Sequence, residues 1–162
     1  AGSIPPHIKS IGIPLVDNET SEYGLEQIVT DKILEKFNQE GILKVLNEEV
    51  ANSILKGTIS KIDENPYTYN KEESVSEYRY KVFLKLEWYD VLNDVNLISK
   101  TYTGFGSYGL SGDISNDGID NDNDGKIDEF DDDEFGEPRS FAARVAMNKI
   151  AEDILNDIMT TW

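Results

Sequence analysis

Hydrophobic and polar residues alternate most regularly over residues 74–90, SVSEYRYKVFLKLEWYD. Because successive side chains of a β-strand point to opposite faces, this period of two predicts one long strand. One face would carry Tyr78, Tyr80, Val82, Leu84, Leu86 and Trp88, and the other Arg79, Lys81, Lys85 and Glu87. The first face is predicted to pack against helices and the second to face water.

This strand is predicted to form a hairpin with the segment that follows it. The residues VLND at 91–94 are typical of a turn, and VNLISKTYTGFGSYG at 95–109 fits a partner strand. A long hairpin is therefore expected over residues 74–108.

Hydrophobic residues three and four positions apart predict two helices. The first begins near residue 21 or 25 and ends at residue 40, before Gly41. The second begins at Pro138 and runs on to Trp162. Its hydrophobic stripe would comprise Val145, Ala146, Ile150, Ile154, Leu155 and Ile158.

Shorter hydrophobic runs at residues 8–16, 42–47 and 53–63 predict further strands, the last of them ended by ENP at 64–66. The order strand, helix, strands, helix predicts an α+β fold. It would be a two-layer sandwich, with two helices packed on one face of a mixed, mainly antiparallel sheet of about four strands. A length of 162 residues fits a single domain, residues 1–162.

Acidic residues are concentrated in one segment of the chain. The formal net charge is −17, from 32 acidic and 15 basic residues, which argues against nucleic acid or an anionic membrane surface as the main partner. Residues 113–137 hold twelve acidic residues and a single basic one, Lys126. The rest of the chain is only mildly acidic, and residues 111–137 are interpreted as an insertion between the last strand and the final helix.

Part of this insertion matches the spacing of an EF-hand calcium loop, in which oxygen ligands at positions 1, 3, 5, 7, 9 and 12 surround the ion and glycine occupies position 6. The ligands would be Asp120, Asp122, Asp124, Lys126 through its backbone carbonyl, Asp128 and Asp131, with Gly125 at position 6. Asp in place of Glu at position 12 shortens the reach to bidentate binding. The loop resembles the calcium repeats of thrombospondin type 3 and dockerin-like modules.

A second, weaker match overlaps the first and starts seven residues earlier. Its ligands would be Asp113, Ser115, Asp117, Ile119 through its backbone carbonyl, Asn121 and Asp124. It has serine at position 3 and Asp120 where an apolar residue is usual. The alternative is a solvated acidic loop that binds no metal, but the mutual repulsion of so many carboxylates favours a bound cation. One Ca²⁺ ion is therefore predicted, and the spacing allows a second.

Residues for catalysis are scarce. The chain has no cysteine, its single histidine is His7 near the N-terminus, and no nucleophile elbow is present, so nucleophilic catalysis has no candidate. GFGSYG at 104–109 satisfies GxGxxG, but an acidic segment rather than a helix follows it, which favours a strand end over a nucleotide site. A hydrolase with paired carboxylates stays open, although nothing singles out a pair. The protein is predicted not to be an enzyme.

Four stretches of the sequence together resemble one known family. PPHIKSIGIPLVDNETSEYGLE, ILKGTISKIDENPYTYN, VSEYRYKVFLKLEWYDV and AEDILNDIM are similar to the lipopolysaccharide-assembly lipoprotein LptE family. The similarity spans residues 5–108 and 139–162, which is nearly everything except the acidic insertion. It rests on core positions and turns rather than on catalytic signatures.

The resemblance implies a non-enzymatic outer-membrane lipoprotein that faces the periplasm. Family members plug the LptD-type β-barrel translocon and help to deliver lipopolysaccharide to the outer leaflet. They are anchored by an acylated N-terminal cysteine, which this chain does not contain. The signal peptide and the lipid-bearing cysteine are therefore expected to lie outside this chain.

Lipopolysaccharide phosphates would prefer a basic surface. Candidate contacts are Arg79, Lys81 and Lys85 on the outward strand face and Lys100 on the partner strand. The alternative is that these are ordinary solubilising charges on the wet side of a sheet. A rival hypothesis makes the acidic loop the functional face of a calcium-dependent docking or adhesion module of an exported protein.

Overall fold

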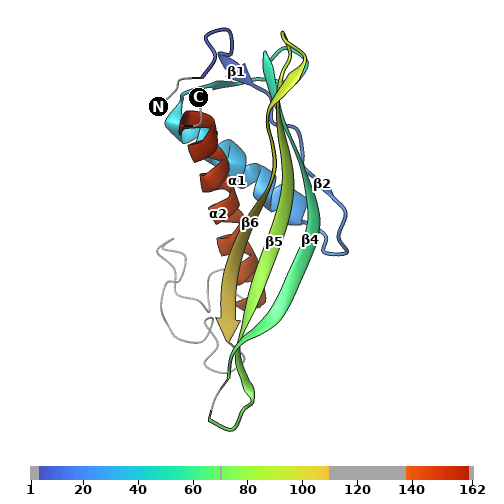
Figure 1. Ribbon diagram of the computed structural model, residues 1–162, viewed down its shortest axis with the longest axis vertical. Coiled ribbons are helices and arrows are strands. Elements are labelled where there is room, and N and C mark those ends of the chain that lie inside the picture. The colour runs from blue at the N-terminus through green and yellow to red at the C-terminus, as the bar shows by residue number, and fades with distance from the viewer. Residues whose placement is uncertain (1–3, 70, 110–137, 161–162) are drawn as a thin grey trace.

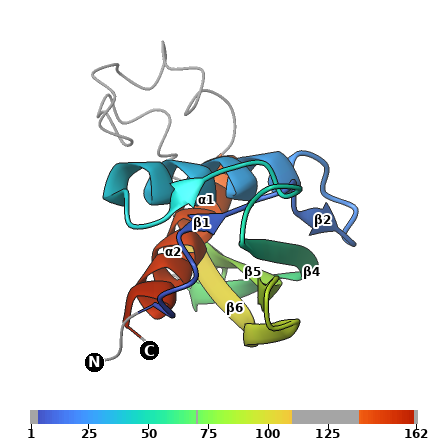
Figure 2. The ribbon, with the colours of Figure 1, turned by 90° about the horizontal axis from the view of Figure 1, so that it is seen from above.

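The computed structural model describes residues 4–69, 71–109 and 138–160. The elements in chain order are β1 (Ser10–Ile11), β2 (Asp17–Asn18), α1 (Leu25–Glu40), β3 (Lys44–Val45), β4 (Ser53–Tyr69), β5 (Val75–Asp90), β6 (Val95–Gly109) and α2 (Pro138–Thr160). A four-stranded sheet has the order β2-β4-β5-β6, in which β2 is parallel to β4 and the other pairs are antiparallel. Both helices lie on one face of this sheet (Figures 1 and 2). The predicted α+β fold is confirmed.

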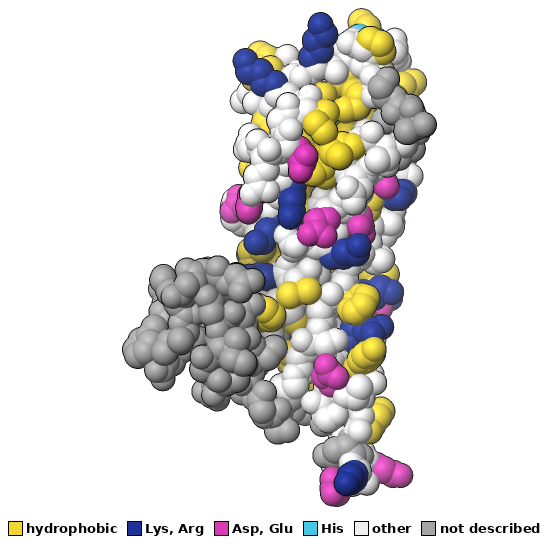
Figure 3. Space-filling view, turned by 90° about the vertical axis from the view of Figure 1, so that its left-hand side faces the viewer, with side chains coloured by type: hydrophobic (Ala, Val, Ile, Leu, Met, Phe, Trp, Pro, Cys, Tyr) yellow, Lys and Arg dark blue, Asp and Glu magenta, His cyan; other side chains and the backbone are white. Residues whose placement is uncertain are grey.

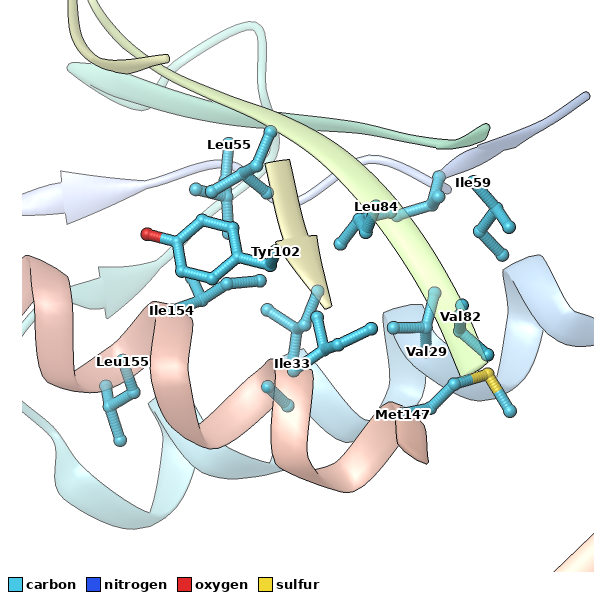
Figure 4. Close-up of a cluster of buried hydrophobic side chains, with 14 of the residues drawn as sticks. Val29, Ile33, Leu55, Ile59, Val82, Leu84, Tyr102, Met147, Ile154 and Leu155 are labelled. Carbon is cyan, nitrogen blue, oxygen red and sulfur yellow. The ribbon is translucent and has the colours of Figure 1, made fainter. Parts of the chain in front are cut away.

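The core lies between the helices and the inner face of the sheet (Figure 4). The inward side chains of β5 are Tyr80, Val82, Leu84, Leu86 and Trp88, and none of them is more than 2% exposed. Helix α1 contributes Leu25, Val29, Ile33 and Phe37 to the same cluster. The alternation read from the sequence therefore gives the correct inward face, except that Tyr78 at its far end is only half-buried.

Helix α1 ends where the sequence predicts. Gly41 adopts the left-handed conformation with φ 63°, and its amide donates a hydrogen bond of 3.0 Å to the carbonyl of Phe37. Glycine adopts this conformation without the steric cost that a Cβ brings, so it ends the helix cleanly.

Helix α2 crosses β6 at very close range. A Cβ atom on Gly104 would lie 2.1 Å from the carbonyl oxygen of Ala146, and one on Gly106 would lie 2.2 Å from that of Ala142. The glycines of GFGSYG thus let a helix backbone approach a strand, and residues 104–109 lie in β6, as the strand interpretation of this motif predicts.

The buried stripe of α2 begins with small residues and includes the predicted Ala146, Ile150, Ile154, Leu155 and Ile158. Ala142, Ala146 and Met147 are fully buried, whereas Val145 is 42% exposed. The prediction that Val145 belongs to the stripe is wrong, because it shares the opposite side of the helix with the polar positions 149 and 152.

Two strand boundaries also differ from the prediction. Strand β4 continues through Pro66 to Tyr69 instead of ending at residues 64–66. Proline is tolerated there because β2 pairs with β4 only at Thr58 and Ile59, so that among the described residues Pro66 lies on an edge strand. Within residues 8–16, where one strand was predicted, the structure has only β1, which pairs in parallel with β3, and β2 follows at Asp17–Asn18.

Candidate functional site

The sheet face opposite the helices carries the basic residues that the sequence analysis selected on β5. Arg79, Lys81 and Lys85 alternate with the buried residues of this strand, so their side chains point outward, as predicted. The guanidinium carbon of Arg79 lies 3.8 Å from the ring centroid of Tyr67 and 4.1 Å from that of Phe105. These rings come from β4 and β6, the two neighbours of β5.

The Arg79 side chain is thus held in a fixed position between two aromatic rings. Its Nε atom is buried and makes no hydrogen bond within the part of the chain that the structure describes. A cation that stacks on aromatic rings keeps its charge while losing part of its hydration shell. Arg79 can therefore present a desolvated cation to an anionic group of a ligand.

Three other lysines of this sheet face, Lys81, Lys61 and Lys56, also lie near aromatic rings. The Nζ atoms of Lys81 and Lys61 lie 5.0 Å and 5.5 Å from the ring centroid of Phe83, and that of Lys56 lies 5.6 Å from the centroid of Tyr89. This combination of aromatic surface and positive charge suits a ligand that is both anionic and apolar.

A shallow depression of about 430 Å³ lies toward the β5–β6 turn on the same face. Lys85 and Glu87 of β5 stand between Lys56 and Thr58 of β4 and the hydroxyl residues Ser99 and Thr101 of β6, and Asp17 of β2 also lines the depression. Its ammonium and hydroxyl groups can donate hydrogen bonds to an anion, whereas its two carboxylates limit how much negative charge it accepts.

Lys100 does not share this outward face. It pairs across the sheet with the buried Leu86, and its Nζ lies 2.6 Å from a carboxylate oxygen of Asp157 on α2. The hydroxyl of Tyr102 donates a hydrogen bond of 2.6 Å to the same oxygen. Burial raises the pKa of Asp157, but the hydrogen bonds from Lys100 and Tyr102 outweigh it and lower the pKa overall.

The expected placement of Lys100 is wrong because of a register shift. β6 pairs Asn96 with Tyr89 but Ile98 with Trp88, so one extra residue is accommodated there. Such a bulge moves every later side chain of the strand to the opposite face. No residue in the sequence marks the bulge. A contact of Lys100 with lipopolysaccharide stays a prediction.

A second polar cluster, which sequence reasoning missed, surrounds Arg139 in the first turn of α2. Its Nε donates hydrogen bonds of 3.0 and 2.9 Å to the two carboxylate oxygens of Glu64 on β4. Both terminal nitrogens donate to Glu22, which precedes α1, and the Tyr108 hydroxyl donates to Glu64. The hydrogen bonds from Arg139 lower the pKa of Glu22. Arg139 therefore ties the start of α2 to the rest of the domain.

One signal could have revealed this cluster. A cation in the first turn of a helix opposes the helix dipole, so it needs a compensating anion from elsewhere. Glu22 and Glu64 supply that anion from positions far apart in the sequence.

The predicted calcium ligands lie outside the described residues. They are Asp120, Asp122, Asp124, Lys126, Asp128 and Asp131 for the first site, and Asp113, Ser115, Asp117, Ile119, Asn121 and Asp124 for the second. Calcium binding and the role of the acidic insertion stay predictions. Within the described ranges, no three His, Cys, Asp or Glu side chains gather as a metal site would require, and no helix is long and apolar enough to cross a membrane.

The comparison with protein families tests the resemblance to the LptE family. A family model described as LptE, lipopolysaccharide-assembly, matches residues 8–161. The chain belongs to the LptE family. This match covers the sheet, both helices and the outward face described above, and it includes the acidic insertion. No curated protein sequence matches the chain.

Solved structures similar to this LptE-family chain share its fold at low sequence identity. XCC0632 from Xanthomonas campestris is 10% identical with a TM-score of 0.61, and covers 98% of this chain and 91% of its own. An uncharacterized lipoprotein B from Nitrosomonas europaea is 11% identical with a TM-score of 0.55, covering 98% and 86%. A PelC dodecamer from Paraburkholderia phytofirmans is 13% identical with a TM-score of 0.51, covering 98% and 96%. At these identities the likeness shows the fold alone.

Proposed function

We propose that this protein is a non-enzymatic, lipid-anchored subunit at the periplasmic face of the outer membrane. It assembles with an LptD-type β-barrel and assists the delivery of lipopolysaccharide to the outer leaflet. The family match over residues 8–161 is the observation that carries this proposal. The sequence supports the non-enzymatic part, because it contains no cysteine and a single histidine.

The outward sheet face is the proposed contact surface for lipopolysaccharide, a molecule with phosphate groups and acyl chains. The Arg79 guanidinium between its two rings suits a phosphate oxygen, because a guanidinium forms bidentate hydrogen bonds to oxyanions. Lys81 beside Phe83 adds charge and apolar surface, and Lys85 adds charge beside the hydroxyl groups of the depression. The overall charge of −17 does not oppose this, because most of the acidic excess lies in residues 113–137.

Two measurements test the proposal separately. Co-expression with the LptD barrel of the same organism and purification through a tag on this chain should recover the barrel. For lipopolysaccharide, the double variant Lys81→Glu, Lys85→Glu should bind about tenfold more weakly, since two lost phosphate contacts are worth about 1.4 kcal/mol or more.

The matched control is Lys149→Glu, a charge reversal at an exposed lysine of α2 whose ion pair with Asp153 lies within one helix. It should bind lipopolysaccharide as the unmodified chain does. Equal affinities for the double variant and the control would remove the outward face as the contact surface. Failure to recover the barrel from intact membranes would contradict the assembly role.

The acidic insertion at residues 111–137 is proposed to bind Ca²⁺ and to serve as an ordered loop of this domain. Calcium ions in proteins take about six to eight oxygen ligands, and the first match fills all six EF-hand ligand positions. Calcium neutralises part of the charge that the loop carries.

A further inference from the structure

Strand β6 forms one edge of the four-stranded sheet. Among the described strands it pairs with β5 alone, and Figure 1 shows it on the side of the sheet away from β4 and β2. In an antiparallel strand, the amide and carbonyl of one residue point to one neighbouring strand, and those of the next residue point the opposite way. Every second residue of β6 therefore directs its backbone groups away from the sheet.

A hydrogen bond on the far side of the sheet identifies these residues. The carbonyl of Ile59 in β4 accepts a hydrogen bond of 2.9 Å from the amide of Glu19, on the side of β4 away from β5. Leu84 lies opposite Ile59, so it directs its amide and carbonyl to β6, where its partner is Tyr102. The inward-facing residues of β6 therefore form the ladder with β5.

The outward-facing residues of β6 present their backbone groups to the free edge. Their side chains lie on the outward sheet face and are exposed or half-buried. They are Ser99, Thr101, Thr103, Phe105 and Ser107. A row of free amides and carbonyls of this kind is a template for an added strand.

The two long edges of the sheet differ in their protection against strand addition. The free part of β4 carries Lys61, Asp63 and Pro66, and its register with β5 shifts at three points. Charged residues, proline and bulges are the features by which proteins keep edge strands from pairing. Residues 101–109 of β6, TYTGFGSYG, contain no charged residue, no proline and no register shift. The edge of β6 is therefore open to a further strand.

A groove of about 410 Å³ lies between this edge and α2. Residues 100–103 of β6 form one wall, and Asp153, Asn156 and Asp157 of α2 form the other. Figure 3 views the molecule from its left-hand side in Figure 1, where α2 and β6 lie, and shows charged side chains of both signs in the middle of this face. Because side chains of a strand alternate, an added strand would direct every second side chain toward the groove.

The charges around the groove decide which strand fits. Lys100 pairs with Asp157 at 2.6 Å, and Lys149 pairs with Asp153 at 3.0 Å, so the four charges balance. Asn156 adds an amide that can donate and accept hydrogen bonds. An uncharged polar side chain suits this groove, whereas a charged one would leave an excess charge beside the helix. A second copy of the chain fits less well, because each copy carries a net charge of −17.

We infer that β6 receives an extended segment of a partner protein as a fifth strand of the sheet. The backbone ladder supplies the affinity, and alternate side chains supply the specificity. The segment carries hydroxyl or amide side chains toward α2, and β-branched or aromatic side chains beside Thr101, Thr103 and Phe105. The choice of partner rests on the proposed function, in which it is the LptD-type barrel.

Residue-resolved hydrogen exchange of the co-purified complex tests this edge. In the free chain, the amides of Thr101, Thr103 and Phe105 should exchange fast, and those of Tyr102 and Gly104 slowly. In the complex with the barrel, the first three amides should exchange at least about tenfold more slowly, because the added strand bonds to them. The control is the free part of β4, whose amides should keep their exchange rates.

Thr103→Pro removes one edge amide and leaves the ladder with β5 in place. Proline favours an extended residue before it, and Tyr102 is already extended in the strand. Strand β4 tolerates Pro66 in the same way. The matched control is Thr103→Ala, which removes the side chain and keeps the amide. Thr103→Pro should bind the barrel about tenfold more weakly, and Thr103→Ala less than about threefold more weakly.

The outcomes separate the edge from the proposed function. Recovery of the barrel with unchanged exchange at Thr101, Thr103 and Phe105 would overturn the inference and leave the proposed function standing. Equal affinities of the two Thr103 variants would do the same. Exchange at these amides that slows with concentration in the chain alone would overturn it in favour of a second copy. Failure to recover the barrel with the unmodified chain would contradict both the proposed function and the partner inferred from it.

Discussion

The close crossing of α2 over β6 gives a sharp test of the fold, through Gly104→Ala. The new Cβ atom would lie 2.1 Å from the carbonyl oxygen of Ala146, whereas ordinary van der Waals contact begins at 3.4 Å. The helix or the strand must therefore move by about 1.3 Å, and the clash is with backbone, which cannot rotate away. Overpacking of this kind costs about 3 kcal/mol, the upper end of the usual range.

Urea denaturation followed by circular dichroism would measure this cost. With a slope of about 2 kcal/mol per molar urea, the midpoint should fall by about 1.5 M. The control is Gly57→Ala in β4, where the new Cβ would lie 3.2 Å from Val16 Cγ2 and 3.3 Å from Leu84 Cδ1, which are ends of side chains that can shift. Its cost should stay below about 1 kcal/mol, because the loss of glycine also reduces the entropy of the unfolded chain. Equal midpoints for the two variants would refute the close approach.

Three further predictions concern the polar groups. Arg139→Met should destabilise the fold by about 1–3 kcal/mol, since it strands partly buried carboxylates. Because Arg139 lowers the pKa of Glu22 in the folded state, the full loss of stability should appear above the ordinary carboxyl pKa of 4.5 and should shrink as the pH falls below it. Urea midpoints measured across this pH range test the trend, and a loss that grows at low pH would contradict it. Asp124→Ala, which removes a ligand shared by both predicted calcium sites, should abolish Ca²⁺ binding in calorimetry, and heat release equal to that of the unmodified chain would contradict the assigned ligands. His7→Ala should cost about 1–2 kcal/mol through the lost contact with the buried Asp90, and an unchanged thermal midpoint would show that the contact contributes little.

The parts of the fold that the sequence predicted are those governed by local periodicity. The alternation in β5 identified its buried face, because one side of a sheet must be apolar to pack against helices. Gly41 indicated the end of α1, because residues with a Cβ atom rarely adopt the left-handed conformation that Gly41 has there. Each of these features is set by neighbours along the chain.

The parts that the sequence did not predict depend on contacts between distant segments. The bulge opposite Trp88 reversed the expected orientation of Lys100, and no local residue pattern marks that extra residue. Strand β4 continues through Pro66 because β2 pairs with β4 only at Thr58 and Ile59, which leaves Pro66 on an edge where no partner among the described residues needs its amide. How far β2 extends cannot be read from the residues around Pro66. Arg139 acquired its role only when Glu22 and Glu64 came together in space. The candidate site was therefore half predicted: its β5 cations were found, and the rings that hold them were not.

The basic residues fall into two groups, one expected to affect the stability of the fold and the other the affinity for lipopolysaccharide. Lys100 lies on the helix side of the sheet and Arg139 lies in the first turn of α2, and each is paired with carboxylates of the same chain. Arg79 and Lys81 face outward, where aromatic rings lie beside their charges without neutralising them. A ring lowers the hydration of a cation but leaves its field available to a ligand, whereas a carboxylate cancels that field. Substitutions of the first pair should therefore change unfolding midpoints more than lipopolysaccharide affinity, and substitution of Lys81 should do the reverse. A charge reversal at Lys81 that unfolds the protein while leaving affinity intact would refute this division.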